Sequence, residues 1–389
     1  ATFSMPTTAF AVMRTDQIRQ CRTLHDLIFL SLTCLHGGKD RPRFLLPRIP
    51  MRLKPESSPS SLLPQEPPVQ DPWRVPWCKS SRSWVNAAIR TSQILDHGYL
   101  IAPRQDMIDD FVSEYAQGRT PNPCVNCNSN TKFKDLLTRG RALGCDQIAS
   151  GHYVRVEHAP EGSSLLRGLD PDKDQSYFLW AMPRSLLPKL LFPVGELTKS
   201  AVRAHARDLA LITADKPESQ EICFVPSGNY RDLLEKRLSP VHPALQPGPI
   251  VRRNGEVVGE HSGYASFTVG QRKGLRGGFP EPMFVLQIRP HTREVVVGNR
   301  DELFEDVVDI GGLNWLAEPP KVGDRVNAQL RYRAAAVPAV VTRIDESLTL
   351  ELAEPQLAVS PGQSAVLFDD RERVLGGGRI VSASTRALV

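Results

Sequence analysis

Two prolines, one on each side of Asn122, restrict the backbone of this chain more than any other local feature. Each proline ring fixes φ and removes a backbone N–H, so a regular helix cannot run through Pro121-Asn122-Pro123. The next residues are Cys124-Val125-Asn126-Cys127. We therefore expect a stiff turn that presents both cysteines, rather than a helix or strand that contains them.

A Cys-x-x-Cys pair has several interpretations. It can be a redox pair, half of a metal site, or a thiol nucleophile activated by a helix N-terminus, and cysteines can also simply fill a core. Apolar residues at helical spacing predict a helix over 131–144, with Cys127 near its start and with Lys132 and Lys134 as cations for a thiolate. A closed zinc site would need Cys223 or a distant histidine, because the chain has no second Cys-x-x-Cys and no His-x-x-x-His.

Length and composition exclude few classes of function. A chain of 389 residues is long enough for two or three domains, and its net charge of +5 suits RNA as well as many ordinary enzymes. The odd number of cysteines, seven, favours free thiols in a reducing cytoplasm. The apolar stretches are shorter than the roughly 20 residues that span a bilayer, so we expect no membrane partner.

The first 105 residues differ from the rest of the chain. Ten prolines fall within the 35 residues from Pro42 to Pro76, mixed with serines, which predicts poor order. The nearest approach to a glycine-rich phosphate loop is His36-Gly37-Gly38-Lys39-Asp40, and that match is too poor to use.

From Asp106 the pattern becomes that of an α/β domain. A helix is expected from Asp106 to Gly118, a strand over 145–150 that breaks at Gly151-His152, and a helix over 198–209 that leads to a strand containing Cys223. Functional loops gather at the carboxyl ends of such strands, where Gly151 and His152 lie, although a lone histidine can also be structural.

Beyond residue 225 the sequence predicts mostly strands. Residues 249–258 form an expected hairpin about Asn254-Gly255, and alternating patterns over 325–332, 337–344 and 363–368 indicate a small barrel or sandwich.

Several separate motifs, in one order, resemble the tRNA-specific 2-thiouridylases from about residue 106 to the C-terminus. The matching segments are Gly118-Arg119-Thr120-Pro121-Asn122-Pro123-Cys124, Cys127-Asn128, Ala149-Ser150-Gly151-His152-Tyr153, Lys173-Asp174-Gln175-Ser176-Tyr177-Phe178-Leu179, Phe192-Pro193-Val194-Gly195, Glu218-Ser219-Gln220-Glu221-Ile222-Cys223-Phe224, Thr268-Val269-Gly270-Gln271-Arg272 and Pro361-Gly362-Gln363-Ser364-Ala365-Val366. The resemblance implies an α/β catalytic domain of the PP-loop ATP pyrophosphatase type (adenine nucleotide alpha hydrolase-like) over 106–225. A small, mainly-β central domain over 226–285 and a tRNA-binding C-terminal β-barrel over 286–389 would follow it.

The activity that this resemblance implies is ATP-dependent transfer of persulfide sulfur to C2 of the wobble uridine, position 34, of tRNA. Cys127 would be the nucleophile and Cys223 the persulfide carrier, and the two would form a disulfide as the thiolated base is released. Mg²⁺ would accompany the ATP, Gly151 would lie at the nucleotide, and a cysteine desulfurase or relay protein would donate the sulfur. Asn122, Pro123 and Cys124 would touch the target base, and the other tRNA contacts would come from His152, Lys173, Asp174, Gln175, Arg331, Tyr332 and Gln363.

The chain also departs from the family pattern. It contains no Ser-Gly-Gly-x-Asp-Ser phosphate loop, which leads us to hypothesise that residues 1–105 are a translation in another frame or a replaced N-terminus. A tRNA-binding remnant is therefore the alternative function. Cys124 stands where many members carry aspartate, so Cys124, Cys127 and Cys223 could instead hold a 4Fe-4S cluster. A thiol-disulfide oxidoreductase is disfavoured because the cysteine pair lies among family-specific motifs.

Overall fold

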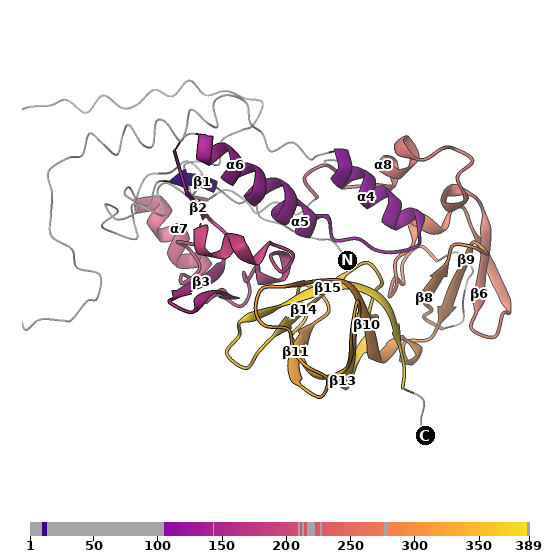
Figure 1. The fold of residues 1–389 in the computed structure, drawn as a ribbon. Coiled ribbons are helices and arrows are strands. Elements are labelled where there is room, and N and C mark those ends of the chain that lie inside the picture. The colour runs from indigo at the N-terminus through magenta and orange to yellow at the C-terminus, as the bar shows by residue number, and fades with distance from the viewer. Residues whose placement is uncertain are drawn as a thin grey trace, which may run out of the picture.

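The computed structural model describes residues 10–13, 105–142, 144–208, 211, 214–215, 222–225, 228–275, 279 and 281–386 (Figure 1). The expectation of poor order over residues 1–105 falls largely outside these residues. Within that region the structure describes a strand, β1 (Phe10–Met13), that the sequence analysis did not expect. It pairs antiparallel with β2 (Gln147–Ser150), with Phe10 opposite Ser150.

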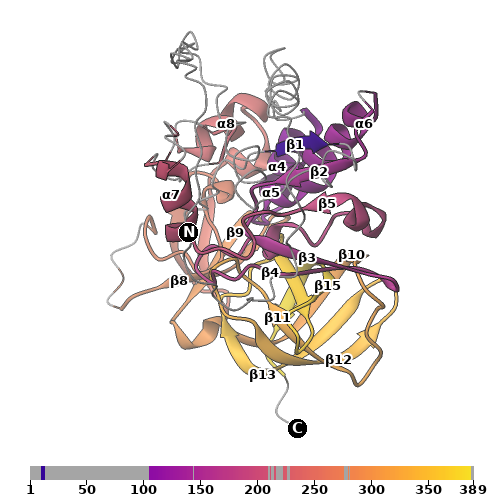
Figure 2. The same cartoon turned by 90° about the vertical axis from the view of Figure 1, so that its left-hand side faces the viewer.

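The part that follows is an α/β domain, as the sequence predicts. Its helices are α4 (Gln105–Ala116), α5 (Pro123–Asn126), a π-helix η1 (Cys127–Phe133), α6 (Lys134–Ala142) and α7 (Lys199–Asp208), with 3₁₀ turns η2 (Ser176–Phe178) and η3 (Arg184–Lys189). Its sheet has the order β1-β2-β5, and β2 runs parallel to β5 (Leu190–Leu191). A hairpin of β3 (Val154–Ala159) and β4 (Gly162–Arg167) lies against the barrel, where Leu166 bridges to Arg373 (Figure 2).

In this domain the structure confirms one local prediction and corrects two. The helix expected from Asp106 to Gly118 is confirmed, and Gly118 ends it with φ of +70°. The cysteine segment is not a bare turn: Pro123 lies in the first turn of α5, where its missing N–H costs nothing, so both cysteines lie in helical backbone. Cys223 lies in a turn rather than in the expected strand.

The central domain contains α8 (Tyr230–Arg237), η4 (Pro243–Leu245) and η5 (Tyr264–Ser266), beside a four-stranded sheet of order β7-β6-β9-β8. Its strands are β6 (Gly248–Arg252), β7 (Val257–His261), β8 (Phe284–Arg289) and β9 (Glu294–Gly298). The β6–β7 pair is the predicted hairpin, with Gly255 at φ of +88°. Because β8 and β9 belong to this sheet, the domain ends near Gly298, not at the expected residue 285.

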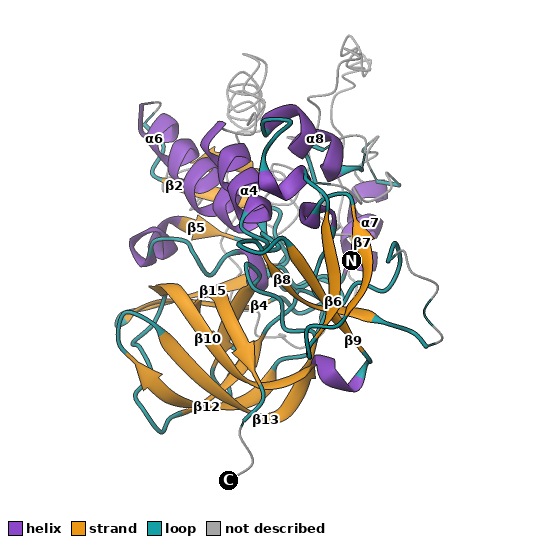
Figure 3. Ribbon diagram, turned by 90° about the vertical axis from the view of Figure 1, so that its right-hand side faces the viewer, coloured by secondary structure: helices purple, strands orange, loops and turns teal. Residues whose placement is uncertain are grey.

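The C-terminal domain is a closed barrel of order β10-β13-β12-β11-β14-β15, which follows the short turn η6 (Asp301–Leu303). The strands are β10 (Phe304–Trp315), β11 (Arg325–Gln329), β12 (Val337–Ile344), β13 (Leu348–Leu357), β14 (Ser364–Phe368) and β15 (Val374–Ser384). Inward residues such as Val341, Leu350 and Ile380 fill its interior. Figure 3 shows the longer helices gathered at one end of the molecule and the barrel at the other.

The α/β domain and the barrel share one apolar core. Phe368 and Val374 of the barrel pack in the same cluster as Phe178 and Trp180. The Trp180 indole N–H also donates to Ser364 Oγ at 3.0 Å. The barrel therefore packs directly against the part of the α/β domain that contains the cysteines.

In the described part of the chain, no helix combines the length and the apolar character needed to cross a bilayer.

Candidate thiol site

The first cysteine pair lies where an α-helix changes into a π-helix. Cys127 opens η1 and is buried, with 8% of its surface exposed, and Asn128 beside it donates from Nδ2 to the carbonyl of Phe178 at 3.3 Å. At the other end of η1, Phe133 is enclosed by Phe192 and His152, with ring centroids at 6.2 and 5.6 Å. A π-helix of seven residues is rare and is typical of functional sites.

The second cysteine segment is a surface turn that packs on α4. Cys223 is exposed, and its neighbour Phe224 packs edge-on against Phe111 of α4 at 5.2 Å between ring centroids. Residues 216–221 and 226–227 on either side lie outside the described residues. Cys124, Cys127 and Cys223 are free thiols.

One cation, the ammonium of Lys132, lies close enough to three of the thiols to affect their pKa values. Burial raises the pKa of Cys124 to about 12 and also raises the pKa values of Cys127 and Cys223. In each case the ammonium of Lys132, on η1, opposes the effect of burial, and a charge on Cys223 raises the pKa of Cys127 further. Of the two lysines considered from sequence, Lys132 is therefore the one near the thiols, whereas Lys134 is exposed on α6.

The described residues offer no group of three or more histidine, cysteine, aspartate or glutamate side chains arranged to hold a metal ion. Charges on Cys127 and Cys223 raise the pKa of Cys124, but the three cysteines do not form such a group.

A loop of the barrel closes over the turn that precedes the cysteines. Gln363 is 3% exposed and donates from Nε2 to the carbonyl of Thr120 at 2.7 Å, and the Thr120 N–H donates to the carbonyl of Pro361 at 2.8 Å. Asn122 is also buried; its side-chain amide lies beside the Tyr177 hydroxyl, and its Oδ1 has no hydrogen-bond partner. Two motifs that lie about 240 residues apart, Thr120-Pro121-Asn122 and Pro361-Gly362-Gln363, therefore build one side of the same site.

Gly151 and His152 follow β2, at the end of the strand that the sequence analysis identified. His152 is fully buried, and its Nδ1 lies 2.6 Å from Ser150 Oγ. Burial lowers the pKa of His152 well below its usual value, so the ring is neutral at pH 7. Its expected contact with tRNA, and the expected contact of the half-buried Gly151 with a nucleotide, stay predictions.

Lys173, Asp174 and Gln175 lie on one loop with different surroundings. The Asp174 carboxylate accepts from Arg167 Nη1 at 2.9 Å and from the hydroxyl of Ser176 at 2.7 Å, and Gln175 Oε1 accepts from the Tyr153 N–H at 2.9 Å. Both side chains are buried and hold the loop together, whereas Lys173 is half-buried. As tRNA contacts, all three stay predictions.

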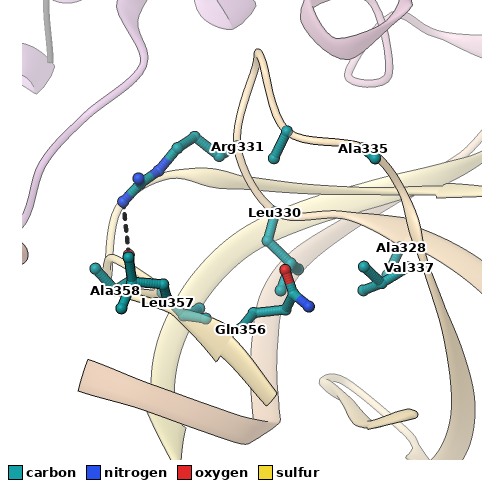
Figure 4. Close-up of a pocket in the computed structure, with 10 residues that line it drawn as sticks. Ala328, Leu330, Arg331, Ala335, Val337, Gln356, Leu357 and Ala358 are labelled. Carbon is teal, nitrogen blue, oxygen red and sulfur yellow. Dashed lines mark hydrogen bonds between the residues drawn. The ribbon is translucent and has the colours of Figure 1, made fainter. Parts of the chain in front are cut away.

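Arg331 and Tyr332 lie on the loop between β11 and β12. Arg331 donates from Nη2 to the carbonyl of Ala358 at 2.8 Å beside an apolar cavity of about 180 Å³ that Leu330, Val337 and Leu357 help to line (Figure 4). Tyr332 packs on Phe178, with ring centroids 4.3 Å apart. Tyr332 therefore lies where the barrel meets the α/β domain, whereas the hydrogen bond of Arg331 stays within the barrel. As tRNA contacts, both stay predictions.

Sequence reasoning missed Asp110, Asn126 and Arg379. Asn126 donates from Nδ2 to Asp110 Oδ2 at 2.8 Å, and Arg379 donates from Nη2 to the same oxygen at 2.7 Å. Arg379 is 269 residues from Asp110 in sequence, so no local pattern could have indicated this contact.

Three family models match the chain in succession. The tRNA methyl transferase HUP domain matches residues 98–227, the tRNA methyl transferase PRC-barrel domain matches 234–299, and the Aminomethyltransferase beta-barrel domain matches 306–380. These ranges follow the α/β domain, the central sheet and the closed barrel of the structure.

Among curated relatives, a tRNA-specific 2-thiouridylase MnmA of Rhodospirillum centenum is 46% identical over 288 residues, which cover 72% of this chain and 72% of the relative. The protein of the same name from Acidithiobacillus ferrooxidans is 46% identical over 284 residues, which cover 72% of this chain and 80% of the relative. That from Carboxydothermus hydrogenoformans is 44% identical over 306 residues, which cover 76% and 82%. With this identity and coverage, the chain belongs to the tRNA-specific 2-thiouridylase family.

Proposed function

We propose that this chain is a tRNA-uridine 2-sulfurtransferase that places sulfur on C2 of the wobble uridine, with Cys223 as the persulfide carrier and Cys127 as the second thiol. The observation that carries the proposal is that two neighbouring residues of α4 contact both cysteine segments, which lie about a hundred residues apart in sequence: Asp110 accepts from Asn126, beside Cys127, and Phe111 packs on Phe224, beside Cys223. The different exposure of the two thiols suits their roles, because a thiol that receives sulfur from another protein has to be accessible.

The sulfur chemistry balances with these two cysteines. The outer sulfur of a Cys223 persulfide would bond to C2 of the base, and the C2–O bond would break, with the oxygen carried off by the group that activates it; in the family ATP supplies that group, so the oxygen would leave with AMP. The Cys127 thiolate then attacks the inner sulfur of Cys223, the original S–S bond breaks with its electron pair going to the sulfur on the base, and a Cys127–Cys223 disulfide remains. A dithiol reductant returns both cysteines to thiols before the next turnover.

In the family, ATP activates the C2 oxygen of the base. The described residues of this chain do not form a recognisable site for the phosphates of ATP. The described part of the chain contains no glycine-rich phosphate loop, and the first strand of the α/β sheet, β1, runs antiparallel to β2. We therefore assign no step to ATP or Mg²⁺ here.

A three-thiolate iron–sulfur cluster is the alternative use of Cys124, Cys127 and Cys223. The absence of a metal-binding grouping among the described residues weighs against it. Iron and sulfide assays on anaerobically purified protein test it, and colourless, iron-free protein that still transfers sulfur excludes it.

The unpartnered side-chain oxygen of Asn122 supports a nucleobase as the substrate. A buried acceptor without a hydrogen bond costs about 1–3 kcal/mol, and the N3–H of a uracil would donate to the Asn122 Oδ1. To reach Asn122, the base would displace the loop that contains Gln363. It would then lie at the start of α5, next to the helical segment that contains Cys124 and Cys127.

Persulfide mapping tests the proposal directly. The chain is incubated with a cysteine desulfurase and cysteine, and its peptides are analysed by mass spectrometry without reductant. We expect one added sulfur atom on Cys223, and we expect Cys223→Ser to abolish loading while Cys127→Ser retains it. Equal loading of Cys124 or Cys145, or none on Cys223, contradicts the proposal.

A tRNA-binding remnant is the second candidate, and the missing phosphate loop favours it. A remnant binds tRNA with the usual salt dependence but forms no 2-thiouridine, and substitution of Cys127 and Cys223 leaves its tRNA affinity unchanged.

A further inference from the structure

Two neighbouring residues of α4 contact the two cysteine segments. Asp110 Oδ2 accepts from Asn126 Nδ2 at 2.8 Å, one residue before Cys127. Phe111 packs edge-on against Phe224 at 5.2 Å between ring centroids, one residue after Cys223. A single turn of one helix therefore holds both segments.

The barrel fixes this turn of α4 through an ion pair. Arg379 of β15 donates from Nη2 to Asp110 Oδ2 at 2.7 Å and from Nη1 to Asp110 Oδ1 at 3.2 Å. This paired geometry is the strong arrangement for arginine and carboxylate, and both side chains are about one-third exposed. Arg379 Nη1 also lies 3.3 Å from Glu114 Oε1, one helical turn further along α4.

The contacts form a continuous path from the barrel to the cysteine helix. Asp110 Oδ2 accepts from both Arg379 and Asn126, so the position of that oxygen depends on the barrel and determines where the Asn126 amide lies. Arg119 pairs with Glu114 and brings the start of the cysteine segment onto the same helix. The central domain holds the end of α4, where the Tyr264 hydroxyl donates to the carbonyl of Ala116 at 2.7 Å.

We propose that Arg379 and Asp110 are positioning residues that set the place of Cys127 relative to Cys223, with α4 as the brace between them. The proposal deepens the sulfur-transfer function and rests on it for its biological meaning. A barrel that contacts tRNA would, through this path, also determine the geometry of the thiols that act on the tRNA.

Thiol alkylation tests the path without ATP, tRNA or a sulfur donor. Iodoacetamide labelling rates are measured by mass spectrometry, with fragment spectra that separate Cys124 from Cys127. Arg379→Gln and Asn126→Ala should each raise the Cys127 rate at least about threefold, because the buried thiol gains mobility, while the Cys223 rate stays within about twofold.

The double variant separates a path from general loosening. In the Asn126→Ala background the further change Arg379→Gln should raise the Cys127 rate less than it does in the parent protein, because the amide relay is gone and only the contact through Glu114 and Arg119 remains. Arg343→Gln is the matched control: it breaks another partly exposed arginine–aspartate pair of the barrel, with Asp309 at 3.5 Å, and should leave Cys127 unchanged.

Two results overturn the proposal: an unchanged Cys127 rate in folded Arg379→Gln protein, or an Arg379→Gln effect that persists in full without Asn126. If Arg379→Gln does not fold, Arg379→Lys, which keeps the charge and loses the paired geometry, is measured instead with the same criteria. A failure of the sulfur-transfer function would appear in persulfide mapping and would leave these rates unaffected.

Discussion

At the scale of single residues, burial and the charge of Lys132 act in opposite directions on the ionisation of the thiols, and burial has the larger effect. A thiolate, not a thiol, is the nucleophile, and burial works against ionisation at Cys124, Cys127 and Cys223. The positive charge of Lys132 works in the opposite direction at all three.

Lys132→Met should therefore raise the pKa of Cys127 and Cys223 and slow their alkylation at pH 7.5. The sign follows from the loss of a cation that favours the charged form, so the alkylation-versus-pH curves move to higher pH. Lys134→Met, on the exposed side of α6, is the control. Curves that coincide for the Lys132 variant and the parent protein would show that Lys132 has no influence on the thiols.

Gly362 matters for a different reason, since it lies against the turn before the cysteines. Its φ is +90°, and a Cβ there would lie 2.9 Å from both the N and the O of Thr120. Gly323, in the same barrel, has φ of +93° with nothing within 4 Å of the same position.

Gly362→Ala should lower the melting temperature more than Gly323→Ala does. Both variants lose about 1 kcal/mol or more because alanine is strained at positive φ, and Gly362→Ala also pushes the Thr120 turn away. Each 1 kcal/mol corresponds to about 2–4 °C for a domain of 150–250 residues, which calorimetry resolves. Equal losses would mean that the loop and the turn separate without cost.

At the scale of elements, β10 contains a carboxyl group that should make stability depend on pH. Glu305 pairs with Gln356 across β10 and β13, and burial raises its pKa from 4.5 to about 7. The neutral form is favoured in the folded protein, so its contribution to stability is complete below pH 4.5 and is lost as the pH rises through 7.

Glu305→Gln should therefore raise the melting temperature relative to the parent protein at pH 8 and change it less at pH 5. The variant is uncharged at both pH values and avoids the cost of burying a carboxylate at pH 8. Thermal scans at the two pH values measure this, with the exposed Glu346→Gln as the control. A gain that is the same at pH 5 and pH 8 would rule out titration of Glu305 as the cause.

The elements also show what the sequence could predict. The helix that became α4 and the Asn254-Gly255 hairpin were predicted because their signals are local: an apolar face, a terminal glycine and a turn that needs positive φ. The π-helix at Cys127 was not predicted. Over seven residues, the spacing of apolar side chains does not distinguish an α-helix, whose hydrogen bonds join residues four apart, from a π-helix, whose hydrogen bonds join residues five apart.

The site divides in the same way. The motifs around Cys127 and Cys223 could be found in the sequence, whereas the bond from Arg379 to Asp110 spans 269 residues and depends on how the barrel closes. The turn at Cys223, expected as a strand, is held by Phe224 on α4, a tertiary contact that local propensity does not contain.

At the scale of the whole molecule, three domains meet around the cysteines. The α/β domain supplies the thiols, the barrel supplies Gln363 and Arg379, and the central domain anchors α4 through Tyr264. The three successive family models correspond to these three domains, and each domain contributes residues that surround the cysteines or hold α4.

The central claim is that Cys127 and Cys223 together deliver sulfur to the wobble uridine. Mass spectrometry of nucleosides from tRNA, isolated from a 2-thiouridylase deletion strain that expresses this chain, tests it most directly. The account predicts that 2-thiouridine returns with the unaltered chain and stays absent with Cys127→Ser or Cys223→Ser. Absence of 2-thiouridine with the unaltered chain, in cells that contain the folded protein bound to tRNA, would contradict the account and identify a remnant that binds without chemistry.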